Sequence, residues 1–373
     1  MRPVASAESS SSVPLCVDLD GTLIRTDLLW ESLLILLKKN PLFAFAVPFW
    51  WAKGRAHLKA QIASRVRLDP SYLPYHAPLL DYLRAEKAQG RRLLLVTASD
   101  AQLAQGVADH VSLFSEVLAS NGRTNLRGRN KAARLAEHFG ERGYDYAGNS
   151  HVDLPVWRRA REALVVNAGS NLATRAAECA TVGKIFGRRK PLRHALIAVL
   201  RPREWFKNVI IFVPLITSHQ FGQWPRTLGA ICGFLAFSLC ASGVSILNDL
   251  YHLEAHRRDP LKNLGPFAAG DLPLSFGFAL APLLLAAGIL IACNLPAGFL
   301  VVLALYLVLT VGYSWPLKQV PLVNVFCFAG LYTIRFIAGC AAVGLKFSMI
   351  WLVMFSIFLT LGLIKRFIKT SID

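Results

Sequence analysis

The feature that most constrains this chain is a change in hydropathy near residue 195. Beyond that point the sequence consists mostly of apolar runs separated by short charged gaps. Because a helix needs about 20 apolar residues to cross a bilayer, we expect an all-α polytopic membrane bundle of about six transmembrane helices. The runs are 208–218 (extended by the amphipathic stretch before it), 228–247, 274–293, 297–315, 322–343 and 348–364. Up to about Thr181, short apolar runs alternate with charged stretches, which is typical of an α/β domain in water.

The basic residues of the gaps alternate along the chain and predict its orientation. One set of gaps carries Lys184, Arg188, Arg189, Lys190, Arg193, Arg201, Arg203 and Lys207, then Arg257, Arg258 and Lys262, then Lys318, and finally Lys365, Arg366 and Lys369. The opposite gaps carry only Arg226 and Lys346. Because cytoplasmic loops are enriched in Lys and Arg, we expect a multi-pass protein of the plasma (inner) membrane with its N-terminal domain and both termini in the cytoplasm. A basic collar facing anionic lipid explains the net charge of +18, so no nucleic-acid partner is expected.

Polar residues cluster directly after the run 228–247, in Asn248-Asp-Leu-Tyr-His252-Leu-Glu-Ala-His256. If the helix continues, Asn248, His252 and His256 lie four apart on one face, with Asp249 beside them. Polar groups at the mouth of a membrane helix are costly and indicate a site, and this spacing suits a metal-bridged diphosphate. A solvated loop after a membrane span explains the same residues, and the charge pattern does not separate the two readings.

Three segments of the first half place polar side chains where predicted strands end. They are Val13-Pro-Leu-Cys-Val-Asp18-Leu-Asp20-Gly-Thr, Leu93-Leu-Leu-Val-Thr97-Ala-Ser99 and Tyr144-Asp-Tyr-Ala-Gly148-Asn149-Ser-His-Val-Asp153, with Lys131 between the last two. Ligands of open α/β sheets bind at the carboxyl ends of the strands, so these groups are expected to meet. A carboxylate that attacks phosphate needs nearby positive charge, and Mg²⁺ prefers oxygen ligands.

With these motifs in this order, residues 13–180 resemble the haloacid dehalogenase (HAD) superfamily of phosphohydrolases. The resemblance implies a Rossmannoid α/β fold with a helical cap at about 27–85. The implied site residues are the nucleophile Asp18 and the acid/base Asp20, Thr97 and Lys131 for phosphate, and Asp18, Asp20, Asn149 and Asp153 for Mg²⁺. Asn149 stands where the family commonly has aspartate, which should weaken metal binding but keep the oxygen ligand. A HAD fold kept only as a scaffold is the alternative.

The expected cap contains Pro41-Leu-Phe-Ala-Phe-Ala-Val-Pro-Phe-Trp-Trp-Ala-Lys53, which is too short to span a bilayer. Its aromatic residues and flanking lysines fit a helix at the membrane interface, and they fit the core of a cap domain equally well.

Four segments of the second half resemble the UbiA superfamily of intramembrane prenyltransferases over about residues 190–369. They are Arg201-Pro-Arg-Glu-Trp-Phe-Lys207-Asn208, Asn248-Asp249, Gly265-Pro-Phe-Ala-Ala-Gly270 and Tyr313-Ser-Trp-Pro-Leu-Lys318. With the preceding domain, the chain resembles the fused HAD–UbiA subgroup, whose functional relatives include decaprenyl-phosphate phosphoribosyltransferases. The resemblance implies a polyprenyl diphosphate or phosphate, a small acceptor and Mg²⁺ at Asp249. The substrate-binding residues expected are Lys207, Asn248, Asp249, Lys262, Tyr313, Lys318 and Arg335.

Arg335 is a charge within the fifth apolar run, and it is expected either to face a lipid phosphate or to pair with a buried acid or carbonyl.

The second half departs from the UbiA pattern at several positions. His252 and His256 stand where the family has aspartates, and neutral imidazole is a poor ligand for Mg²⁺. Histidine can instead favour a transition metal or, when protonated, donate to a phosphate. Asp259, Gly265 and Asn324 also replace a usual His, Arg and Asp. The domain is expected to be C-terminally short, because it has six runs where the family usually has nine.

The sequence therefore predicts four parts: a disordered tail at 1–12, the HAD-like domain at 13–180, a basic linker at 181–190 and the UbiA-like domain at 191–373. Our first hypothesis is a membrane prenyltransferase whose HAD domain acts on a phosphorylated substrate or product at the cytoplasmic face. The second is a membrane-anchored HAD phosphatase with an inactive UbiA domain. The third is a catalytically dead interaction protein.

Overall fold

The computed structural model describes residues 13–122, 124–188, 192–314, 321–345 and 350–372. The chain forms two compact units. The first comprises residues up to 195 together with 251–275, and the second comprises 196–250 and 276–373.

The first unit is built on a six-stranded parallel sheet with the strand order β3-β2-β1-β4-β5-β6. The strands are β1 (Leu15–Val17), β2 (Leu93–Asp100), β3 (Glu116–Ser120), β4 (Asp145–Gly148), β5 (Glu162–Ala168) and β6 (Thr181–Arg188). β1 lies in the middle, where Val17 pairs with Leu95 of β2 and Ala147 of β4. The predicted α/β class is confirmed, and the carboxyl ends of β1, β2 and β4 lie side by side.

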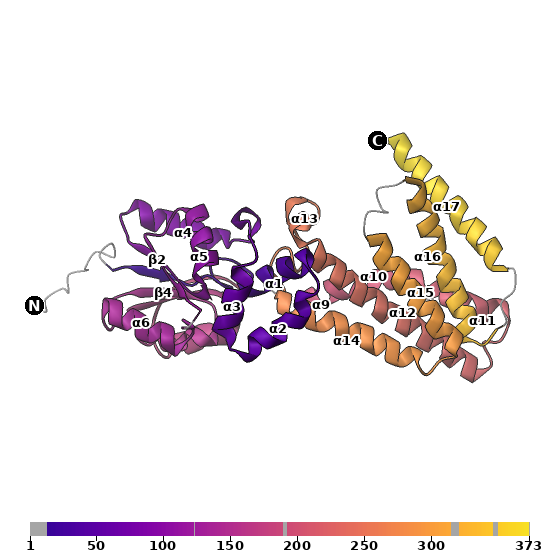
Figure 1. The fold of residues 1–373 in the computed structure, drawn as a ribbon, viewed down its shortest axis with the longest axis horizontal. Helices are drawn as coiled ribbons and strands as arrows, with labels where there is room; N and C mark the ends of the chain where they lie inside the picture. Colours follow the sequence, from indigo (N-terminus) through magenta and orange to yellow (C-terminus); the bar gives the residue numbers. More distant parts are fainter. Residues whose placement is uncertain (1–12, 123, 189–191, 315–320, 346–349, 373) are drawn as a thin grey trace, which may run out of the picture. The chain divides into compact units, whose positions relative to one another are not determined.

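Helices cover both faces of this sheet (Figure 1). Alternate strand residues point to opposite faces, so that Val17 and Leu95 join one core while Cys16 and Leu94 join the other. The first core includes α4 (Ala77–Ala88) and α5 (Ala101–Val111), and the second includes α6 (Arg129–Phe139), α7 (Leu154–Trp157) and α8 (Ser170–Ala177).

The expected cap lies between β1 and β2. It consists of α1 (Leu28–Lys39), α2 (Phe43–Ala52), α3 (Arg55–Ala63) and the short 3₁₀ helix η1 (Pro70–Tyr72). Asp27 caps α1, because its carboxylate accepts a hydrogen bond from the N–H of Leu29. None of the residues of α2 is buried, and Phe45 and Phe49 are 73% and 72% exposed. One face of α2 therefore does not form cap core.

Residues 181–188 do not form the expected linker. They form β6, which pairs with β5 at the edge of the sheet. Val182 and Phe186 pack against the cores of opposite faces, although regular alternation would put residues four apart on one face. The register of β6 against β5 shifts by one residue between them, at Gly183, and this shift reverses the alternation. The charges Lys184 and Arg188 concealed this strand in the sequence, yet such charges are common on edge strands because they prevent further pairing.

Residues 251–275 lie within the range expected for the membrane domain, but they pack with the first unit. They contain α13 (Leu253–Arg258). The Arg257 guanidinium donates to both carboxylate oxygens of Glu31 in α1, at 2.6 and 3.1 Å, and both side chains are buried. Near the end of the segment, Arg25 Nη2 lies 2.7 Å from Asp271 Oδ1. Two ion pairs thus hold the segment against the loop and helix that follow β1.

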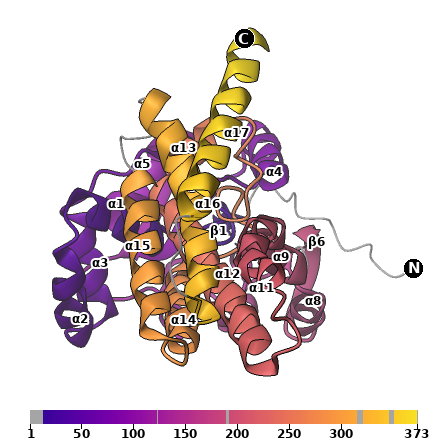
Figure 2. The same ribbon diagram turned by 90° about the vertical axis from the view of Figure 1, so that its right-hand side faces the viewer.

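The second unit is all-α, as predicted. Its helices include α12 (Trp224–Tyr251), α14 (Leu274–Ala292), α15 (Ala297–Ser314), α16 (Pro321–Ala342) and α17 (Ile350–Ile372). Within the described residues, α12, α14 and the part of α16 from Val325 onward are long and apolar enough to cross a membrane. Helices α15, α16 and α17 run alongside one another (Figure 2). At Gly288 of α14 a Cβ atom would lie 2.8 Å from the carbonyl oxygen of Ala236, so the glycine allows α12 and α14 to pack closely.

The first expected span, 208–218, is not one long helix. The chain there forms α9 (Leu192–Leu200), α10 (Pro202–Trp205), the 3₁₀ helix η3 (Phe206–Phe212) and α11 (Val213–Thr217). Pro214 lies in the first turn of α11 and has no N–H for a continuing helix. The run is apolar, but its local backbone chemistry divides it.

Candidate functional site

Asp18 and Asp20 directly follow β1, in a loop whose shape depends on Gly21. This glycine has φ +76°, and a Cβ atom there would lie 2.0 Å from Asn149 Nδ2. A left-handed backbone with no room for a side chain requires glycine. The loop is tied to β4 by the hydrogen bond from the N–H of Asp18 to the carbonyl of Ala147 at 2.9 Å.

A buried ion pair lies at the base of the site. Lys131 Nζ, at the start of α6, is 2.6 Å from Asp18 Oδ1 and 2.7 Å from the Tyr146 hydroxyl. Lys131 is only 3% exposed. Burial raises the pKa of the Asp18 carboxyl, and Lys131 partly offsets this rise. The sequence predicted both charged residues and did not single out Tyr146.

Asp153 organises the loop after β4. Its Oδ2 accepts hydrogen bonds from the N–H groups of Asn149 and Ser150 and from Ser150 Oγ, at 3.0–3.1 Å. Its Oδ1 accepts from the Tyr146 hydroxyl at 3.2 Å. Tyr146 therefore links Asp153 to Lys131. These contacts make Asp153 a residue that positions Asn149.

Asp20 is held from two sides. Its Oδ2 accepts from Ser99 Oγ at 2.6 Å, and its Oδ1 accepts from the N–H of Leu28 at 2.8 Å. Burial raises the pKa of Asp20 to about 6, and the neighbouring Asp27 adds to the rise. Thr97 is fully buried, and its Oγ1 accepts from the N–H of Ser99 at 2.9 Å. At the end of β2 the hydroxyl that contacts Asp20 therefore belongs to Ser99 and not to the predicted Thr97.

The acids, Lys131 and the loop after β4 line a cleft of about 330 Å³, and the predicted Thr97 is not part of its lining. Of the predicted residues it brings together Asp18, Asp20, Lys131, Asn149 and Asp153. It also contains three basic residues that the sequence did not single out, namely Arg55, Lys59 and Arg127. Burial lowers the pKa of Lys59, while Asp20 and Asp27 oppose the shift. A signal existed for the first two, because residues 55 and 59 share a face of a cap helix. A cleft with acids at its base and several cations around it suits a phosphate ester.

The donor set of this cleft fits Mg²⁺. The groups that line it near Asp18 are carboxylate and amide oxygens, and Mg²⁺ is usually bound by one or two carboxylates together with substrate phosphate and water. Among the described residues no group of three or more His, Cys, Asp or Glu side chains forms a dedicated metal cage. Asp18 and Asp20, with the Asn149 amide, would hold the ion, and Asp153 would act through the loop.

In the second unit, Asp249 near the end of α12 is paired with a cation. Both of its carboxylate oxygens lie 2.7 Å from Arg201 Nη2. Arg201 has a left-handed backbone, with φ +51°, and precedes α10. The predicted metal ligand therefore already has a positive charge beside it.

The helix expected through His252 and His256 is interrupted. α12 ends at Tyr251 and α13 begins at Leu253, with His252 between them at φ −97° and ψ 18°. The condition for a shared face with Asn248 is therefore not met. His252 and His256 remain neighbours, because the N–H of His256 donates to the carbonyl of His252 at 2.9 Å and their ring centroids lie 6.3 Å apart.

Arg335 is buried in α16, and its bonded groups are neutral. Its Nε donates to Asn208 Oδ1 at 2.8 Å, its Nη2 lies 3.4 Å from the Tyr306 hydroxyl, and its Nη1 donates to the carbonyl of Leu331. Asn208 in turn donates to Ser238 Oγ at 3.0 Å. The predicted pairing with a carbonyl is present, and an amide and a hydroxyl add to it.

The remaining predicted residues are dispersed. Asn248 is half-buried in α12, and Lys207 is exposed. Lys262 is exposed and belongs to the first unit. Tyr313 lies in α15, and Lys318 lies outside the described residues.

Comparisons with known proteins match both halves of the chain. The family model for haloacid dehalogenase-like hydrolases covers residues 15–158, and that of the UbiA prenyltransferase family covers 209–367. The uncharacterized protein y4nM of Sinorhizobium fredii is 37% identical over 361 residues, which are 96% of this chain and 69% of that protein. The decaprenyl-phosphate phosphoribosyltransferase of Mycolicibacterium smegmatis is 30% identical over 50% of this chain and 60% of that enzyme. A structure of a UbiA homolog from Archaeoglobus fulgidus bound to DMAPP and Mg²⁺ is 21% identical, with a TM-score of 0.38, and covers 44% of this chain and 60% of that one.

Proposed function

Because the chain belongs to the proteins that join a haloacid dehalogenase-like hydrolase domain to a UbiA prenyltransferase-family domain, we propose that it is a membrane enzyme with two activities. The UbiA-type part uses a polyprenyl phosphate or diphosphate and a small polar acceptor or donor. The HAD part hydrolyses a phosphate monoester at the cytoplasmic face. The observation that carries the proposal is the buried pair of Lys131 and Asp18, set beside Asp20 in a cleft with three further cations.

The cleft supports hydrolysis in two steps. Lys131 holds Asp18 Oδ1, and the other carboxylate oxygen attacks phosphorus. The phosphorus–oxygen bond to the alcohol breaks as an aspartyl-phosphate forms, and Asp20 gives its proton to the departing alcohol oxygen. A water molecule then attacks the phosphorus while Asp20 takes the proton from it. Inorganic phosphate leaves, and the Asp18 carboxylate is restored.

Charge compensation explains the residues around these acids. The phosphoryl group carries negative charge throughout, and Lys131, Lys59 and Arg127 line the cleft that receives it. Bound Mg²⁺ would neutralise further charge on the phosphoryl oxygens. Asp20 lines the cleft beside Asp18, where it can pass a proton to the leaving oxygen, and burial raises the pKa of its carboxyl above the usual value for aspartate.

For the transferase part, the support comes from cations inside the second unit. Arg335 is buried, and the groups that hydrogen-bond to it within the described part of the chain are the neutral Asn208 amide, the Leu331 carbonyl and the Tyr306 hydroxyl. A phosphate on a polyprenyl lipid would supply that charge in a region of low dielectric. We propose that Arg335 contacts this phosphate, with Asn208 holding the guanidinium in place.

A second candidate function is a membrane-anchored phosphatase whose UbiA part is inactive. The specific observation in its favour is Asp249, whose two oxygens are engaged by Arg201. A carboxylate paired in this way is less available to a metal ion, and the neighbouring histidines are weak ligands for Mg²⁺.

Both proposals are tested with the full chain purified in detergent. We expect Mg²⁺-dependent release of phosphate from small esters, and a loss on the order of 10³-fold or more in the Asp18→Asn variant, which cannot form the acyl-phosphate. The exposed Asp81→Asn on α4 is the control. Turnover retained by Asp18→Asn would overturn the hydrolase assignment. Formation of a lipid product from polyprenyl phosphate and a phosphoribosyl donor favours the enzyme with two activities, and its absence beside active hydrolysis favours the anchored phosphatase.

We also propose that both termini lie in the cytoplasm, and the support is the enrichment of Lys and Arg in the gaps on one side of the apolar runs. A reporter fused after Asp373 should be active only on the cytoplasmic side, and activity confined to the opposite side would contradict the proposal.

A further inference from the structure

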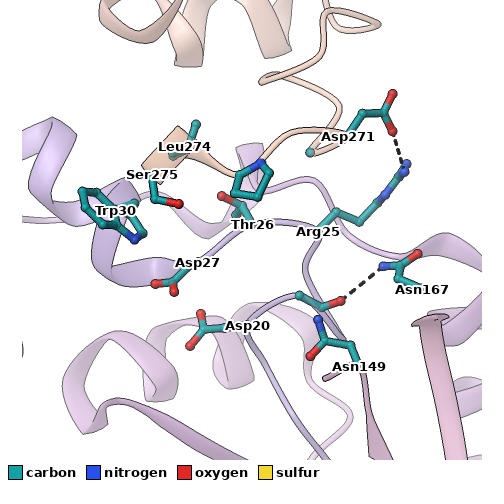
Figure 3. A pocket seen from close by; sticks show the side chains of 13 residues that line it. Asp20, Arg25, Thr26, Asp27, Trp30, Asn149, Asn167, Asp271, Leu274 and Ser275 are labelled. Atoms are coloured by element: carbon teal, nitrogen blue, oxygen red, sulfur yellow. Dashed lines mark hydrogen bonds and ion pairs between the residues drawn. The ribbon is translucent and has the colours of Figure 1, made fainter. Parts of the chain in front are cut away.

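A second cavity of about 240 Å³ adjoins the hydrolase cleft. We call it the side chamber. It shares Asp20, Asp27, Trp30 and Asn149 with the cleft, and it extends from them to the segment 270–275 (Figure 3). The motifs of the first half of the sequence predict the cleft but not the side chamber. The far wall of the chamber is formed by residues 270–275, which follow α13 and lie outside the hydrolase motifs.

This wall is built to stay in place. Gly270 has φ +71°, and a Cβ atom there would lie 2.5 Å from the carbonyl oxygen of Arg25, so the two backbones touch. The next residue, Asp271, has a buried side chain and accepts from Arg25 Nη2 at 2.7 Å. Further back, the buried pair of Arg257 and Glu31 fixes the same segment. Three contacts from one segment to the loop and helix after β1 define a shaped wall beside the acids.

The lining of the chamber is chemically mixed in a specific way. It contains the carboxylates of Asp20, Asp27 and Asp271 and the amides of Asn149 and Asn167. In Figure 3, Asp20 and Asp27 lie on one side of the chamber, and Asn149 and Asn167 lie on another. Carboxylates and amide oxygens accept hydrogen bonds from hydroxyl groups, and amide N–H groups donate to them. A ligand rich in hydroxyl groups matches this lining.

The polarity of the lining favours a hydroxylated ligand over a hydrocarbon chain. The cavity volume of about 240 Å³ leaves room for a compact sugar or polyol. A polyprenyl chain would cover this polar lining without forming hydrogen bonds to it, whereas a hydroxylated ligand can form them. Trp30 adds one aromatic surface, against which the C–H groups of a sugar ring can pack.

We propose that the side chamber binds the polyhydroxylated alcohol half of a phosphate monoester, so that the substrate class of the hydrolase is a sugar phosphate. The proposal rests on the proposed hydrolase function. Asp20 lines both cavities, so an ester whose phosphorus lies at Asp18 places its leaving oxygen beside Asp20 and its sugar in the chamber. Gly270–Ser275 then determines which alcohols are accepted. A free sugar phosphate and a phosphorylated sugar carried on a lipid present the same chemistry to this chamber.

The hydrolysis test compares substrates and a chamber variant in the full chain. We expect kcat/KM for ribose 5-phosphate to exceed that for butyl phosphate, which has no hydroxyl groups, by about tenfold or more. Ser275→Phe narrows the chamber from its far wall, and it should lower kcat/KM for ribose 5-phosphate by about tenfold more than kcat/KM for butyl phosphate, which removes this preference. Ser64→Phe, at an exposed serine after α3, is the matched control. Equal kcat/KM values for the two esters in the native chain, or equal losses for both in Ser275→Phe, would overturn the proposal.

A binding test separates the chamber from the chemistry. In the Asp18→Asn chain, calorimetry should show ribose 5-phosphate binding more tightly than inorganic phosphate, and Ser275→Phe should abolish the difference. If the native chain hydrolyses no ester but ribose 5-phosphate still binds more tightly than inorganic phosphate, the proposed hydrolase function is wrong and the proposed sugar site is supported. If the difference is absent, the chamber proposal fails even where butyl phosphate is hydrolysed. If the chain hydrolyses a lipid-linked sugar phosphate but not free ribose 5-phosphate, the sugar phosphate that the chamber binds is the one carried on a lipid.

Discussion

The hydrolase cleft and the end of α12 both carry acids predicted to bind metal and phosphate, and the structure treats the two regions differently. In the cleft, Asp18 is held by Lys131 through one oxygen, and space for a ligand adjoins the carboxylate. At the end of α12, both oxygens of Asp249 are engaged by Arg201. The first region keeps Asp18, Asp20 and Lys131 and has Asn149 at one position where an acid is common, whereas the second has His252 and His256 at two such positions. The cleft therefore holds its acid and cation beside open space, whereas the carboxylate at the end of α12 is already neutralised by an arginine.

The largest expected effect comes from removing the cation of the cleft. Lys131→Met leaves Asp18 buried without its partner, which should destabilise the first unit by about 3–5 kcal/mol and reduce hydrolysis on the order of 10²-fold or more. Thermal unfolding in detergent and phosphate release measure the two effects. The exposed Lys39→Met is the control. Native activity in Lys131→Met would show that the cation beside Asp18 does not support hydrolysis, and the contrast with Asp249 would then have no functional meaning.

The second prediction concerns the segment that α12 leads into. Arg257→Met leaves Glu31 buried and unpaired, and the expected loss of stability is about 3–5 kcal/mol. The adjacent Arg258 pairs with Glu254 on the surface, so Arg258→Met should cost no more than about 0.5 kcal/mol. The transition temperatures of the two variants provide the comparison. Equal shifts would show that the buried pair does not hold residues 251–275 in the first unit.

A third experiment tests the loss of charge after α12. In His252→Asp with His256→Asp, Mg²⁺-dependent binding of a non-hydrolysable prenyl diphosphate analogue should tighten by about tenfold, because added carboxylates favour Mg²⁺. The exposed His110→Asp on α5 serves as the control. Titrations with and without Mg²⁺ give the result. Tight Mg²⁺-dependent binding by the unmodified chain would show that the histidines do not disable the site.

The smallest effect is expected at α2. Its exposed face includes Phe45 and Phe49, and lysines lie near both ends of the helix, so we expect this face to contact lipid. A polarity-sensitive fluorophore attached at Phe49→Cys should emit at shorter wavelength in proteoliposomes than the same fluorophore attached at the exposed Asp109→Cys. The label at position 109 serves as the water-exposed reference. Identical emission spectra at the two positions would contradict the proposed contact between α2 and lipid.

Several properties of this protein were predictable from the sequence because they depend on local patterns. The α/β class follows from short apolar strands that end in polar residues, and the all-α class follows from long apolar runs. The convergence of Asp18, Asp20, Lys131 and Asn149 was also predictable, since the carboxyl ends of neighbouring parallel strands meet at one edge of the sheet.

Other features were decided only by the tertiary structure. The pairing of Arg257 with Glu31 joins residues 226 positions apart, and that of Arg25 with Asp271 joins residues 246 positions apart. No local period encodes such contacts, because an ion pair depends on where whole elements pack. Long-range packing also places Arg201 beside Asp249, pairs the basic segment 181–188 with β5 as the strand β6, and positions Gly270 in the wall of the side chamber. Local chemistry determined which elements form and which acids gather, and long-range packing determined which charges are neutralised and where space for a ligand remains.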